Sequence, residues 1–103
     1  MWDAVVADWR TAPLRPELRA TLAFLEKQTL RPEELEPADA DAVRAAGVSD
    51  EALRDAATIC ALFNMIVRLA DSLGWDVPPP ERLAARAPAM LEGGYALESI
   101  LGR

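Results

Sequence analysis

The longest patterned stretch, residues 44–75, reads RAAGVSDEALRDAATICALFNMIVRLADSLGW and decides the fold. Ser49 is a favoured helix N-cap, and the acidic Asp50 and Glu51 follow it in the first turn, where they face the positive end of a helix. Gly74 supplies a stop signal at the other end. The stretch therefore predicts one helix of about 24 residues, roughly 36 Å long at 1.5 Å per residue.

Apolar residues cover two adjacent sides of this predicted helix. One side carries Leu53, Cys60, Val67 and Ala70. The other side, about 100° round the axis, carries Ile59, Leu62, Ile66, Leu69 and Leu73. Because one neighbour cannot cover so broad a surface, we expect a central helix that is packed from several directions.

The rest of the chain predicts an all-α domain, since no segment alternates apolar and polar residues and β-branched residues are few. Pro16 and Pro37 suit the first residue of a helix, because their missing N–H is not needed there. The predicted helices span residues 2–10, 16–29 and 37–46, with a weaker one over 81–91 that Pro88 interrupts and a last turn or two over 95–101. Residues 1–77 are expected to form the helical core, and residues 78–103 a proline-led tail of the same domain.

Composition excludes several classes of partner. The 103 residues carry a formal charge of −6, from 17 acidic and 11 basic side chains. Nucleic acids and anionic membranes both require clustered Lys and Arg, which this chain lacks. The N-terminus does not resemble a signal peptide, and the apolar run over residues 59–70 is shorter than the roughly 20 residues of a membrane span. We therefore expect a soluble, cytoplasmic protein.

Cys60 is the only cysteine, and the chain has no histidine. A reactive thiol needs a nearby cation, histidine or helix N-terminus that lowers its pKa, together with access to solvent. Cys60 lies in the middle of the predicted helix, so we interpret it as a small core residue. A redox-active or ligand-binding thiol is the alternative.

Asn64, Arg68 and Asp71 interrupt the apolar pattern of the same helix. Asn64 shares a face with Cys60 and Asp71, so these residues form either structural hydrogen bonds or the floor of a small polar pocket. The carboxylates of Glu33, Glu34 and Glu36 are interpreted as a solvated turn rather than a metal site. Zinc, P-loop, dinucleotide and serine-nucleophile motifs are absent, and no cofactor is predicted.

Two stretches resemble a known family: VRAAGVSDEAL, residues 43–53, and ALFNMIVRLADSLG, residues 61–74. With ADWRTAPLRPELRATLAFLEKQTLRP before them, residues 7–77 are similar to the C-terminal half of peroxidase-related proteins of the alkylhydroperoxidase AhpD-like, carboxymuconolactone decarboxylase-like superfamily. The resemblance implies a helical bundle that is commonly oligomeric. It carries over only the scaffold positions, which are Asn64, Arg68, Leu69, Ala70 and Asp71.

Active members of that family reduce peroxides with a Cys-x-x-Cys motif assisted by a histidine, and this chain has neither. An attacking thiolate without a resolving thiol cannot close a disulfide and recycle. The resemblance therefore implies an AhpD-like scaffold or partner subunit without its own thiol site. The alternatives are an oxidoreductase completed by a partner chain that bears the Cys-x-x-Cys half, in which Cys60 or a pocket around Asn64 and Arg68 does the chemistry, and a small-ligand-binding module.

Self-association follows from the same pattern. The missing half of the family fold would cover part of the long helix, so its apolar surface should stay exposed in a monomer and be buried in a homo-oligomer. The predicted contact residues are Ile59, Leu62, Phe63 and Ile66, with Trp2 and Trp9 as further candidates.

Overall fold

The computed structural model describes residues 2–94, and every regular element among them is a helix, which confirms the all-α prediction. The elements are α1 (Trp2–Asp8), α2 (Pro16–Leu30), a 3-10 turn (Pro32–Glu34), α3 (Pro37–Ala45), α4 (Asp50–Leu73) and α5 (Pro80–Gly93). The chain divides into two compact units, Met1–Asp71 and Ser72–Arg103. The helical turn predicted over 95–101 lies outside the described residues.

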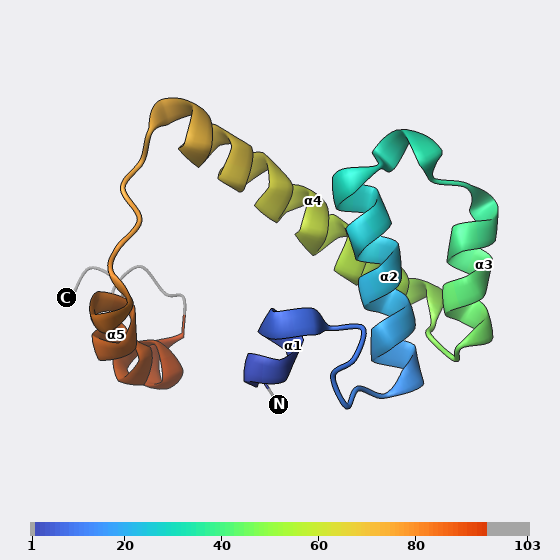
Figure 1. Ribbon diagram of the computed structural model, residues 1–103, viewed down its shortest axis with the longest axis horizontal. Helices are drawn as coiled ribbons and strands as arrows, with labels where there is room; N and C mark the ends of the chain where they lie inside the picture. Colours follow the sequence, from blue (N-terminus) through green and yellow to red (C-terminus); the bar gives the residue numbers. More distant parts are fainter. Residues whose placement is uncertain (1, 95–103) are drawn as a thin grey trace. The chain divides into compact units, whose positions relative to one another are not determined.

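In the first unit, α2 and α3 lie side by side (Figure 1). Lys27 joins them, since its Nζ donates to both carboxylate oxygens of Asp39 at 3.0 Å. The backbone N–H of Glu36 also donates to Asp39, at 2.8 Å, so this carboxylate caps the start of α3 as well. These two interactions, with the Glu36 N–H the larger, hold the pKa of Asp39 below its ordinary value.

The turn from α3 to α4 follows the expected capping chemistry. Gly47 adopts φ +99, and its N–H donates to the carbonyl of Arg44, while the N–H of Val48 donates to that of Val43. This is the Schellman arrangement, in which a residue with positive φ ends the helix. Ser49 Oγ then accepts from the N–H of Ala52 at 3.1 Å and caps α4, as predicted.

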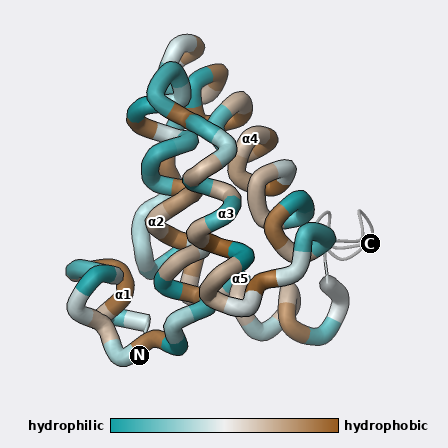
Figure 2. Tube along the Cα trace, turned by 90° about the vertical axis from the view of Figure 1, so that its right-hand side faces the viewer, coloured by the Kyte–Doolittle hydropathy of each residue, from teal (hydrophilic) through white to brown (hydrophobic). Residues whose placement is uncertain are grey.

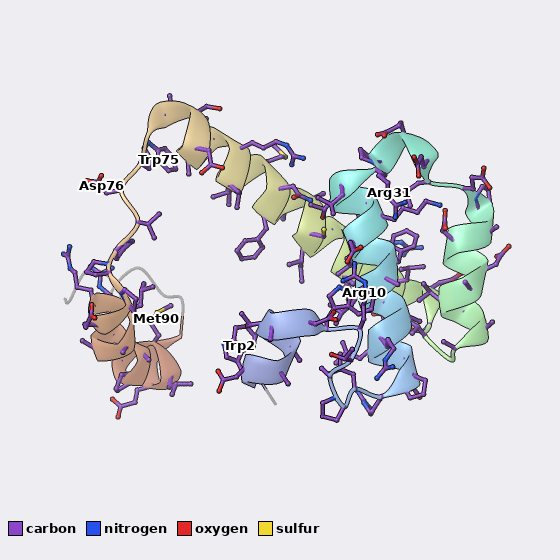
Figure 3. All side chains as sticks on the ribbon, viewed as in Figure 1. Trp2, Arg10, Arg31, Trp75, Asp76 and Met90 are labelled. Atoms are coloured by element: carbon purple, nitrogen blue, oxygen red, sulfur yellow. The ribbon has the colours of Figure 1, made fainter. Side chains whose placement is uncertain are left out.

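The segment that follows α1 is attached to α2 through one carboxylate. Glu26 accepts a hydrogen bond from Trp9 Nε1 at 2.8 Å and two from the guanidinium of Arg10, which lies 4.9 Å from the Trp9 ring centre. Figure 3 labels Arg10 beside α2. Arg19 donates to the carbonyl of Ala12 at 2.8 Å, and Ala12 is buried. The predicted apolar face of α1 is only partly covered, because Trp2 stays 75% exposed.

Helix α4 has the predicted length and ends before Gly74, which adopts φ +66. It crosses α2 and continues well past it (Figure 1). Leu53 is its only buried residue. Within the first unit, neighbours cover only the face that carries Leu53, so this unit does not supply the expected packing from several directions.

In the second unit, α5 starts at Pro80 and runs to Gly93, with Pro88 inside the helix rather than ending it. Pro80 occupies the first helical position, where its fixed φ favours the helix and its missing N–H costs nothing. Pro88 does cost a hydrogen bond to the preceding turn, so α5 forms despite it.

Candidate functional site

The dominant surface feature of the first unit is a row of apolar side chains on α4 beyond its contact with α2. We call it the outer face, and it consists of Ile59, Leu62, Phe63, Ile66 and Leu69. Each of these side chains is between 50% and 63% exposed. Hydrophobic residues recur along α4 in the hydropathy colouring of Figure 2. All four contact residues predicted from the helix on its own therefore lie on one surface that the rest of the first unit leaves exposed.

An apolar row of this kind is unusual on an isolated soluble domain. Single exposed hydrophobic residues are normal, but contiguous apolar patches of several hundred Å² generally mark sites of interaction. In the first unit only Ala12, Val43 and Leu53 are buried among the described hydrophobic residues. The unit thus leaves more large apolar side chains on the outer face than it buries in its interior.

The length of α4 also bears on the membrane prediction. Within residues 2–94, α4 is the one helix whose length and apolar composition would allow it to cross a membrane. Core helices of soluble proteins meet the same two conditions. Counting only residues 59–70 understated this, because Asn64 and Arg68 lie within a longer apolar window. The expectation that the chain has no membrane partner therefore stays a prediction, and the length of α4 is not an argument for it.

A small polar cluster joins α2 to α4 where the outer face begins. The Thr29 hydroxyl lies 3.3 Å from the Cys60 sulfur, and Asn64 Nδ2 lies 3.2 Å from Thr29 Oγ1 and 3.4 Å from Cys60 Sγ. All three side chains are half-buried. Asn64 has two N–H groups to donate, so one amide can serve both the hydroxyl and the sulfur.

The chemistry of this cluster favours structure over catalysis. The two groups in contact with the sulfur are a hydroxyl and an amide, both neutral, and neither supplies the cation or base that activates a thiolate. Residues 2–94 contain no group of three His, Cys, Asp or Glu side chains that could hold a metal ion. The cluster therefore acts as a polar tie between two helices.

The other predicted polar residues lie outside the cluster. Arg68 Nη1 donates to the backbone carbonyl of Asn64 at 3.2 Å. Asp71 is exposed, and among the described residues no hydrogen bond joins it to Cys60 or Asn64. Of the residues that share this face of the helix, the structure brings Cys60 and Asn64 together, and Asp71 lies apart from them.

Two residues of α2 were missed. Thr29 belongs to the cluster, and Gln28 Nε2 donates to the carbonyl of Ala57 on α4 at 3.0 Å. A signal for Thr29 was present, because it continues the stripe of Leu18, Leu22 and Leu25 at helical spacing. No comparable signal marks Gln28, whose carbonyl oxygen is buried without a partner among the described residues.

A hollow of about 460 Å³ lies between α2 and the segment that follows α1, and its lining is mainly apolar. Its two charged residues are already engaged, Arg10 with Glu26 and Arg19 with the Ala12 carbonyl. This hollow therefore presents little unsatisfied polar chemistry to a ligand.

Comparison with known proteins adds no relative. The chain matches no protein-family model, and no curated protein matches it significantly. The functional proposal consequently depends on the outer face, the polar cluster and the sequence stretches themselves.

Proposed function

We propose that this chain is an AhpD-like, carboxymuconolactone decarboxylase-like helical subunit that works as an assembled homo-oligomer and has no thiol peroxidase activity of its own. One observation carries the proposal. The rest of the first unit leaves the apolar half of the longest helix exposed, at the positions that the sequence pattern assigns to a subunit contact.

The physical reason is the free energy of apolar burial. Burying exposed apolar surface is worth about 25 cal/mol per Å², so burial of the five large side chains of the outer face favours association. Association also costs translational and rotational entropy, and burial offsets this cost only where the partner surface is complementary in shape. The flat row of an exposed helix face is well suited to another helix, which is the partner that the all-α fold offers.

The single cysteine supports the second half of the proposal. Peroxide reduction that recycles through a disulfide needs two thiols, and this chain has one. The Cys60 sulfur contacts Thr29 and Asn64, so it contributes to the α2–α4 tie. We infer a scaffold role for the chain within the assembly.

Sedimentation of three proteins tests the assembly. Wild type should form an oligomer at micromolar concentration, and Ile66→Asp should lose it, because the interface would then bury an unpaired charge. Ala61→Asp is the matched control, since Ala61 is exposed on the same helix and lies about 135° from the centre of the row at 100° per residue. It should assemble like wild type. A stable, monodisperse wild-type monomer at micromolar concentration contradicts the proposal.

A further inference from the structure

The spacing of the outer face has a two-fold symmetry that specifies how a second copy fits. Ile59, Leu62, Ile66 and Leu69 alternate at spacings of three and four residues, which is the a/d pattern of helices that pack side by side. The same four positions are symmetric about residue 64. An inverted copy therefore places Ile59 opposite Leu69 and Leu62 opposite Ile66, so that each of these four positions meets an apolar partner.

We propose that the partner is a second copy of this chain, packed antiparallel along α4 about a two-fold axis at the level of Asn64. This inference rests on the proposed function and adds the partner, its direction and its register. Phe63 and Met65, which are both exposed, flank the row on its two sides and come close to their own copies near the axis.

Charge distinguishes this direction from the parallel one. The row continues toward the N-terminus of α4 through Asp55 and Glu51, which are exposed and spaced at the same helical interval. A parallel pair would bring each of these carboxylates next to its own copy, and like charges at close range destabilise an interface. An antiparallel pair moves them to opposite ends of the contact, away from their own copies, with Asp55 at the level of Leu73 of the other copy.

The helix dipoles favour the same direction. The N-terminus of α4 is its positive end, and an antiparallel partner places its negative end beside it, whereas a parallel pair aligns like ends. Both electrostatic effects therefore point to the inverted arrangement that the apolar spacing allows.

Distances between spin labels test the direction directly. In a Cys60→Ser background, which keeps a hydrogen-bonding group beside Thr29, a single label is placed through Glu51→Cys or through Ala61→Cys. The antiparallel register separates the two Glu51 sites by about 39 Å along the axis and the two Ala61 sites by about 9 Å, at 1.5 Å per residue. A parallel pair gives no axial separation at either site, so the distance between the two Glu51 sites falls far below the antiparallel value.

The expected result is a long distance at Glu51 and a clearly shorter one at Ala61. Short distances at both sites overturn the antiparallel arrangement and leave self-assembly standing. No dipolar coupling at either site, together with a monomeric mass, overturns both this inference and the proposed function, and it assigns the outer face to a partner other than a second copy.

Discussion

The two halves of α4 differ in burial, and the difference is the opposite of what their composition would suggest. Residues 50–58 carry Asp50, Glu51, Arg54 and Asp55, yet this is the half in which Leu53 is buried against the rest of the unit. Residues 59–69 are much more apolar, yet their large side chains on the outer face are half or more exposed. Within the first unit, the more polar half holds the one buried residue of α4, and the more apolar half keeps the large side chains of its outer face exposed. This contrast is the observation from which we propose that a second copy covers the outer face.

The largest effect is expected where the chain covers itself. Leu53→Ala should lower the free energy of unfolding by about 2 to 4 kcal/mol, because it leaves a cavity beside a buried contact. Leu62→Ala is the matched variant in the uncovered half, and at low protein concentration it should cost less than about 1 kcal/mol. Urea unfolding of dilute samples measures both. Equal costs would show that the two halves are not different.

The polar tie at the boundary between the halves should contribute less. Asn64→Ala removes the amide that donates to Thr29 and Cys60, and we expect a loss of about 1 kcal/mol, typical of one hydrogen-bonded side chain. Thr29→Val combined with it in a double-mutant cycle isolates the coupling between them. Strictly additive losses would mean that this hydrogen bond does not stabilise the fold.

Acid should lower the free energy of unfolding of the first unit through Asp39, which joins α3 to α2. Its pKa is lowered in the folded protein, so the carboxylate stabilises the fold at higher pH, and that contribution disappears as the pH falls below the ordinary value of 3.8 and through the lowered pKa. Asp39→Asn should make the free energy of unfolding depend less on pH in this acidic range, and it should leave the outer face of α4 unchanged. Thermal unfolding across acidic pH measures it, and identical profiles for the two proteins would remove Asp39 from the explanation.

The smallest expected effect is on peroxide chemistry. Reduction of an organic hydroperoxide with a dithiol reductant should proceed at the uncatalysed rate, because Cys60 has no resolving thiol and its contacts are neutral. Cys60→Ser should give the same rate. Turnover well above background that Cys60→Ser abolishes would instead favour the oxidoreductase alternative.

Sequence patterns predicted the local structure of this chain well, for identifiable reasons. The start and end of α4 were given by Ser49 and Gly74, since capping chemistry depends on neighbouring residues. The contact of Cys60 with Asn64 was also predictable, because residues four apart meet on a helix. Packing was less accessible: periodicity shows that a face is apolar but not what covers it, so the sequence pattern could not show that α2 contacts Cys60 and Asn64 and leaves the outer face exposed.

Amide hydrogen exchange along α4 tests the central claim most directly, because it reports each half separately. If a second copy covers the outer face, protection of residues 59–69 should rise with protein concentration, while protection of residues 50–58 stays nearly constant. Ile66→Asp should remove the concentration dependence. Protection of residues 59–69 that does not change from nanomolar to high micromolar protein would contradict the claim that another copy of the chain covers this half of the helix.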